Sequence, residues 1–351
     1  MVAREPCRDG SANQASMALN LERYRRQLEK TLQRVPRKLL VEQTFCPRMW
    51  SEVFITDRGE VYFCCHALPF RIGNLYDSTL EELWGGFRAR QARRMSLTRT
   101  LYCYDRCTLL TAEEHATLPG SDSTPVPAYS ALTRLKILMG ELCNLRCIMC
   151  DQDHRSKVHL PLELLKRRID FTHITDIEFQ GGEPMAMKSA KEAYVWLTEE
   201  LGKKVNFLTN GMLMPGDWAE RLCRGSSWLY FSINGVQPET YARVNVGGKL
   251  ERVLENLGKV REARERLGSK LELVGHFTMV PDNVGEVDRF PAFAKAQGLD
   301  RVEFGYDIST IPRWFDEHPE ERARLRRSFA AQLAEPPLPI DTNRLARLGL
   351  A

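Results

Sequence analysis

A tight cysteine triplet lies in the stretch ELCNLRCIMC (141–150), where three and then two residues separate Cys143, Cys147 and Cys150. A closed structural zinc site needs a fourth cysteine or histidine, whereas three thiolates on a four-iron cluster leave one iron open to a reacting ligand. His154 follows closely, so a Cys3His zinc site is the alternative. A cluster with one open iron is the interpretation that gives this triplet a catalytic role.

The sequence around the triplet alternates between short apolar segments and amphipathic segments. The expected strands are 132–139, 174–180, 204–210, 227–233, 271–280 and 301–306. The expected helices lie near 161–171, 189–201, 216–224, 249–267 and 284–297. This order is typical of parallel strands joined by helical crossovers, and six strands predict an α/β fold with a partial (β/α)6 barrel. Chemistry in such barrels sits at the carboxyl ends of the strands, and the triplet follows the first of them.

The composition indicates a globular protein of the reducing cytoplasm. The chain has 351 residues, 43% of them hydrophobic, without an apolar run of the roughly 18 to 20 residues that span a bilayer and without an apolar export signal. Ten cysteines in such a chain favour metal binding over disulfides. The net charge of +4 predicts neither a membrane nor a nucleic-acid partner.

The motif CNLRCIMC (143–150) resembles the cluster loop of the radical S-adenosylmethionine (SAM) superfamily, and the end of the second expected strand, QGGEP (180–184), is similar to the GGEP motif of that family. The resemblance implies that the triplet holds a 4Fe-4S cluster whose open iron binds SAM. It also implies cofactor binding by the second motif, whose members are Gly181, Gly182, Glu183 and Pro184. Glycines let the backbone approach a ligand closely, and a carboxylate suits the ammonium group of the cofactor.

Small polar side chains end the third and fourth expected strands at the same rim. The resemblance implies cofactor hydrogen bonds from Ser232 and Asn234, and Asn210 is a further candidate. Asn-Gly is also a favoured turn dipeptide, so turn chemistry is the alternative for both asparagines. His276, inside an expected strand, is interpreted as a core histidine rather than a proton carrier.

A second set of cysteines precedes the expected barrel. This segment resembles SPASM or twitch domains, which bind auxiliary 4Fe-4S clusters and commonly follow the barrel. The expected ligands of one auxiliary cluster are Cys46, Cys64, Cys103 and Cys107. Four such thiols could instead hold zinc. Cys65 could replace its neighbour as a ligand or act as a hydrogen-atom donor, while Cys223 is interpreted as a core residue.

Five segments follow from these patterns. They are a disordered N-terminus (1–16), a helix with the auxiliary-cluster domain (17–116), a linker rich in proline, glycine and serine (117–130), the barrel (131–310) and a C-terminal helical extension (311–351).

The resemblance implies that one electron cleaves SAM to a 5′-deoxyadenosyl radical, which removes a hydrogen atom from a substrate. The electron would come from an external reductant such as flavodoxin or ferredoxin. We expect oxidation of a small-molecule biosynthetic intermediate. The alternatives are a peptide-crosslinking enzyme, an epimerase that uses Cys65, and a zinc-bearing binding module without catalysis.

Overall fold

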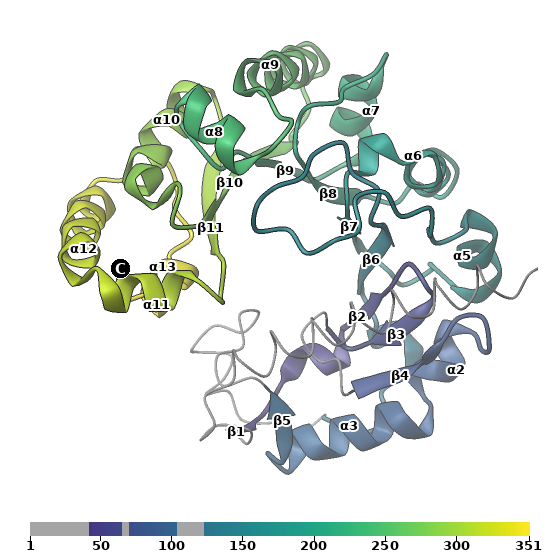
Figure 1. Ribbon diagram of the computed structural model, residues 1–351. Helices are drawn as coiled ribbons and strands as arrows, with labels where there is room; N and C mark the ends of the chain where they lie inside the picture. The colour runs from purple at the N-terminus through teal and green to yellow at the C-terminus, as the bar shows by residue number, and fades with distance from the viewer. Residues whose placement is uncertain (1–41, 65–69, 104–122) are drawn as a thin grey trace, which may run out of the picture.

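The computed structural model describes residues 42–64, 70–103 and 123–351, with the backbone alone at 42–44 and 101–103 (Figure 1). The N-terminal segment 1–16, the helix expected after it, Cys65 and Cys107 lie outside the described residues. Within the described part, no helix is long and apolar enough to cross a membrane.

A nine-stranded sheet organises the described chain. In order across the sheet, its strands are β11 (Arg301–Tyr306), β10 (Glu272–Met279), β9 (Trp228–Ser232), β8 (Val205–Thr209), β7 (Asp176–Gly181), β6 (Arg134–Gly140), β2 (Glu52–Ile55), β3 (Glu60–Tyr62) and β4 (Arg71–Asn74). The six strands β6 to β11 all pair in parallel, which confirms the predicted partial barrel. A separate pair consists of β1 (Glu42–Thr44) and β5 (Leu101–Cys103).

Helices cover the outside of the arc that β6 to β11 form (Figure 1). They are α5 (Leu162–Arg168), α6 (Lys188–Val195), which continues as a π-helix (Trp196–Glu200), α7 (Trp218–Gly225), α8 (Pro238–Val244), α9 (Leu250–Leu267) and α10 (Phe290–Ala296), which follows a 3-10 helix (Val284–Arg289). The five expected helices are all present. Helix α8 was not expected, because its seven residues are too few for a clear amphipathic period.

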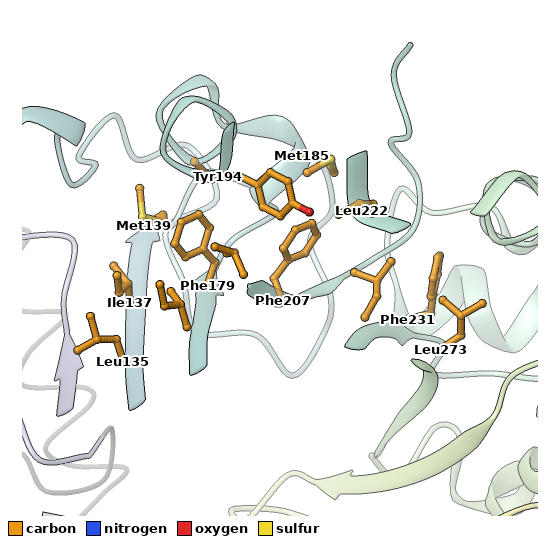
Figure 2. Close-up of a cluster of buried hydrophobic side chains, with 14 of the residues drawn as sticks. Leu135, Ile137, Met139, Phe179, Met185, Tyr194, Phe207, Leu222, Phe231 and Leu273 are labelled. Atoms are coloured by element: carbon orange, nitrogen blue, oxygen red, sulfur yellow. The ribbon is translucent and has the colours of Figure 1, made fainter. Parts of the chain in front are cut away.

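Side chains of alternate strand residues build the core between the sheet and these helices. Leu135, Ile137 and Met139 of β6 point outward and are buried, together with Phe179 of β7 and Phe207 of β8 (Figure 2). The period of two that this alternation requires places the intervening residues inside the barrel. The interior is therefore lined by the polar half of each strand.

The C-terminal segment adds three helices beside β11, namely α11 (Ile311–Glu317), α12 (Pro319–Ala334) and α13 (Asn343–Arg347). Phe329 of α12 packs edge-to-face on Phe304 of β11, with 5.5 Å between ring centroids. These helices cover the end of the sheet that β11 would otherwise expose.

The N-terminal part shares the barrel sheet. Strand β2 pairs in parallel with β6, from Glu52 opposite Arg134 to Ile55 opposite Ile137, and β3 and β4 follow as antiparallel strands. Helices α2 (Leu80–Trp84) and α3 (Phe87–Leu97) complete this part. The sequence pattern did not predict the pairing, because β2 is only four residues long and its partner lies about 80 residues away in the chain.

Arg93 of α3 connects segments of the N-terminal part through buried hydrogen bonds. Its guanidinium is fully buried, lies 4.0 Å from the Trp84 ring centroid and donates to the carbonyl oxygens of Met49 and Trp84. The Trp84 indole donates in turn to the carbonyl of Ala128, in the expected linker. The described part of that linker is therefore packed against the N-terminal helices.

Candidate active site at the carboxyl ends of the strands

The cysteine loop (residues 141–150) follows β6 and is held on two sides by backbone hydrogen bonds. On the β7 side, the Glu183 amide donates to the carbonyl of Leu142 at 2.9 Å. On the opposite side, the Ile148 amide donates to the carbonyl of Val244 at 3.0 Å. The Arg146 amide donates to the carbonyl of Val246 at 2.9 Å. The loop is thus clamped between the end of β7 and the end of helix α8.

Gly181 and Gly182 make the first of these contacts possible. Gly181 has φ +123°, and a Cβ there would lie 2.0 Å from the carbonyl oxygen of Gly140. A Cβ at residue 182 would lie 2.1 Å from the carbonyl oxygen of Leu142. Gly182 therefore allows the backbone to approach the cysteine loop, and Gly181 allows it to approach the end of β6.

The Glu183 carboxylate is fully buried and bonded within the protein. Its oxygens accept hydrogen bonds from the amide of Met185 at 3.0 Å, the Thr209 hydroxyl at 2.9 Å and the Asn210 amide at 2.7 Å. Burial raises the pKa of this carboxyl to about 7. The side chain joins the β7 turn to the end of β8. The carboxylate thus has a structural role in this turn, its expected contact with the cofactor ammonium stays a prediction, and Pro184, also buried, begins the next turn.

Cys143, Cys147 and Cys150 are half-buried and form no disulfide. Burial raises the pKa of Cys143, and burial together with the neighbouring thiolates raises the pKa of Cys147 to about 12. Bare thiolates are therefore disfavoured in this site, and a bound cation would stabilise them. Iron is such a cation, and the backbone amide of Leu145, which donates to the Cys143 sulfur at 3.4 Å, suits a thiolate ligand. The donor set fits a three-cysteine cluster.

The geometry differs from that of a site for a single ion. Among the residues that the structure describes, no three His, Cys, Asp or Glu side chains converge closely enough to hold one metal ion. The ligands of one zinc all lie about 2.3 Å or less from it, whereas the irons of a cluster each take a separate thiolate. The backbone carbonyl of His154 accepts a hydrogen bond from the Cys143 amide at 3.2 Å.

Two amide side chains face the triplet. Asn210, expected at the rim, donates to Asn144 Oδ1 at 2.9 Å and lies 3.7 Å from the Cys143 sulfur. Asn245 donates to the Cys147 sulfur from 3.5 Å. Sequence reasoning missed Asn245, which lies 98 residues from its partner and follows a helix that was not expected.

The two rim residues of β9 differ in their surroundings. Asn234 is buried, and its side-chain oxygen accepts from the amide of Thr278 at 2.7 Å, so it joins β9 to β10. Ser232 is half-buried, faces the interior beside His276 of β10, and has no side-chain hydrogen bond within the described part of the chain. Ser232 is therefore the better placed of the two for a bound molecule.

His276 lies in the barrel rather than in the outer core. Its register places it between Ser232 and Glu303 on neighbouring strands. Burial lowers the pKa of the imidazole to about 4, so the ring is neutral at pH 7, and Nδ1 has no hydrogen-bond partner among the described residues. The interpretation as a satisfied core histidine is wrong in this respect.

Ion pairs line the lower barrel. Lys136 and Glu178 pair at 3.3 Å on β6 and β7, and Arg301 pairs with Glu272 at 3.0 Å across β10 and β11. Ser232 and His276 lie nearer the rim than these ion pairs. The Ser232 hydroxyl and His276 Nδ1 have no hydrogen-bond partner within the described part of the chain. A polar ligand could therefore bind above the ion pairs.

The second cysteine set is described only in part. Cys46 and Cys64 are half-buried, and the Cys46 amide donates to the Ser96 hydroxyl at 2.7 Å. Only the backbone of Cys103 is described, in β5. Cys107 and Cys65 lie outside the described residues.

Two family models match the chain. Residues 137–290 match the radical SAM superfamily, and residues 46–108 match the SPASM iron-sulfur cluster-binding domain. The chain thus contains a radical SAM domain and, ahead of it, a SPASM domain. These two domains imply a catalytic 4Fe-4S cluster, an auxiliary cluster and SAM as cofactors.

Curated relatives are named GTP 3′,8-cyclases. A probable GTP 3′,8-cyclase of Methanococcus maripaludis strain C5 is 28% identical over 128 residues, which cover 34% of this chain and 42% of the relative. The GTP 3′,8-cyclase of Rhizobium meliloti strain 1021 is 25% identical over 252 residues, covering 64% and 68%. The chain thus spans less than half the length of the first of these relatives.

Solved structures that align with part of the chain include two that contain S-adenosylmethionine. SuiB of Streptococcus suis bound to S-adenosylmethionine aligns with a TM-score of 0.45 and 15% identity over 59% of this chain and 49% of SuiB. Native anSMEcpe with bound AdoMet aligns with a TM-score of 0.45 and 14% identity over 59% and 63%.

Proposed function

We propose that the triplet Cys143, Cys147 and Cys150 holds the cluster at which this enzyme cleaves SAM. The clamped cysteine loop supports this most directly: it fixes three thiols at the carboxyl end of β6, with amide donors beside two of them. These three thiols would hold the cluster, which, once reduced by a flavodoxin-like or ferredoxin-like protein, would supply the one-electron chemistry that cleaves SAM and allows a hydrogen atom to be taken from the substrate.

The protein positions the cofactor around this loop. Gly181 and Gly182 keep the β7 turn against the loop, and the Glu183 carboxylate fixes the turn from inside, so the cofactor would meet the backbone of this turn. Ser232 would donate or accept a hydrogen bond at the opposite wall. Asn210 and Asn234 act by holding neighbouring segments.

We propose that the substrate is a polar small molecule that undergoes oxidation. The ion pairs Lys136–Glu178 and Arg301–Glu272 make the barrel interior polar, and neutral His276 offers a hydrogen-bonding nitrogen beside Ser232. Relatives named for GTP act on a small polar molecule, which agrees with this substrate class. Cys46, Cys64, Cys103 and Cys107 are the proposed ligands of an auxiliary cluster, which would supply a one-electron acceptor for the substrate radical as that radical releases a proton.

The test compares iron, labile sulfide and 5′-deoxyadenosine formation in the anaerobically reconstituted parent and in the Cys143→Ala, Cys147→Ala, Cys150→Ala triple variant. Cys223→Ala is the matched control, because this buried thiol in α7 donates to the Val260 carbonyl. We expect about eight irons in the parent and the control, and about four in the triple variant, with cofactor cleavage in the first two only.

The alternatives give other results. Zinc without labile sulfide in the parent would identify a binding module. Solvent deuterium in a product of inverted configuration, lost on Cys65→Ala, would identify an epimerase. Cleavage of SAM in the triple variant would disprove the ligand assignment.

A further inference from the structure

Helix α8 ends against the cysteine loop with two fully buried polar residues, Tyr241 and Asn245. They lie four residues apart, so both face the same side of the helix. Neither residue belongs to the CNLRCIMC motif (143–150) or to the GGEP motif (181–184). Each nevertheless leaves a polar atom without a hydrogen-bond partner among the described residues, the Tyr241 hydroxyl and Asn245 Oδ1.

The Asn245 amide is aimed at the Cys147 sulfur. Its backbone is fixed on both sides, because its N–H donates to the Tyr241 carbonyl at 2.7 Å and its own carbonyl accepts from Gly248 at 2.7 Å. The side-chain nitrogen lies 3.5 Å from the Cys147 sulfur. The reverse orientation of the amide would bring oxygen lone pairs toward a thiolate, so the donor must face the sulfur.

The Tyr241 hydroxyl lies in the same electrostatic environment. Burial raises the pKa of the phenol, and the charges of Cys147, Glu183 and Cys143 raise it further. Gly248 packs on this ring, since a Cβ added to this glycine would lie 2.8 Å from Tyr241 Cε1. A buried hydroxyl without a partner is unfavourable, so we expect its acceptor to belong to a group bound at the neighbouring cysteine loop.

We propose that Asn245 and Tyr241 are positioning residues that donate hydrogen bonds to the sulfur atoms of the catalytic cluster and raise its reduction potential. Asn245 donates to the Cys147 thiolate, and the Tyr241 hydroxyl, which has no acceptor among the described residues, would donate to a sulfide of the bound cluster. Reduction adds a negative charge to the cluster, and donors to its sulfurs stabilise that charge. This inference rests on the proposed role of Cys147 as a cluster ligand.

The experiment measures the midpoint potential of the catalytic cluster in the full-length chain. Parent, Tyr241→Phe, Asn245→Leu and the double variant are reconstituted with iron and sulfide and titrated anaerobically while the electron paramagnetic resonance spectrum is recorded. The catalytic cluster is followed by the component whose shape changes when SAM is added, because only its open iron binds the cofactor. Iron per chain is measured in parallel.

Tyr194→Phe is the matched control for Tyr241→Phe. Tyr194 is equally buried, but its hydroxyl bonds to the carbonyl of Arg221 and the hydroxyl of Ser226 in the outer helical layer. Its removal deletes one buried phenolic hydroxyl without touching the cysteine loop. We expect the control to keep the parent potential.

We expect the potential to become more negative in each single variant and most negative in the double variant, at parent iron content. Parent potentials in both single variants would overturn the inference, and a shift equal to that of Tyr194→Phe would do the same. If Asn245→Leu does not fold, Tyr241→Phe decides the question alone. A parent without a SAM-responsive signal would overturn the proposed function itself, a result that no variant can imitate.

Discussion

The Glu183 carboxylate accepts a hydrogen bond from the Asn210 backbone amide at 2.7 Å, which joins the GGEP turn after β7 to the end of β8. The carboxyl is fully buried, and no cationic side chain contributes to its pKa of about 7. The carboxyl therefore links the two strand ends, and its contribution to the free energy of unfolding depends on pH.

The first prediction concerns this pH dependence. Because the pKa of Glu183 is raised from 4.5 to about 7 on folding, the folded chain binds the proton more tightly than the unfolded chain. The stability due to this group is complete below pH 4.5 and is lost as the pH rises through 7. Relative to Glu183→Gln, the parent should lose about 3 kcal/mol of unfolding free energy across this window. Urea unfolding of both proteins at several pH values measures the difference, and a parent that gains stability over the same range would contradict the prediction.

The second prediction concerns Gly182→Ala. A Cβ there would lie 2.1 Å from a backbone oxygen of the cysteine loop, so the loop must move, at a cost of about 1–3 kcal/mol. We expect lower stability and fewer irons bound to the triplet.

Gly258→Ala in helix α9 is the control, because a Cβ there meets no atom within 4 Å. It should raise stability by up to about 1 kcal/mol and leave iron content unchanged. Equal iron in both variants would show that the close approach is unimportant.

The third prediction concerns Arg93→Met. The change leaves the carbonyls of Met49 and Trp84 without their donor and removes the cation over the Trp84 ring. We expect a loss of about 3 kcal/mol in unfolding free energy. Arg94→Met, on the exposed side of the same helix, should change stability by less than about 0.5 kcal/mol. Similar losses in the two variants would refute the role of Arg93.

The fourth prediction concerns Ser232→Ala. If the hydroxyl bonds to SAM, its loss should weaken binding by about 1 kcal/mol, or roughly fivefold in Kd. Titration calorimetry with the reconstituted enzyme measures this. Ser227→Ala, at the exposed amino end of the same strand region, should keep the parent affinity. An unchanged Kd in Ser232→Ala would remove this residue from the cofactor site.

The barrel could be predicted from sequence because its strands and helices carry strong local periods. Each expected strand overlaps an observed one, and the cysteine triplet follows β6 as expected. The pairing of β2 with β6 could not be predicted, since a four-residue strand has too little pattern to reveal its partner.

In the candidate site too, local motifs could be predicted from the sequence, whereas tertiary contacts could not. Motif spacing identified the triplet and the GGEP turn, and the family models agree with that interpretation. The direction of a side chain is not encoded in spacing, so the hydrogen bond of the buried Glu183 carboxylate to the end of β8 could not be predicted. Asn245 meets Cys147 through a tertiary contact that no local pattern announces.

The parallel pairing of β2 with β6 limits how this chain can be divided. A truncated barrel beginning near residue 130 would present the bare edge of β6, a row of unpaired N–H and C=O groups that invites aggregation. The strand thus uncovered is the one that leads into the cysteine loop. Removing the N-terminal part to simplify the enzyme would therefore disturb the very triplet that such a truncation was meant to isolate.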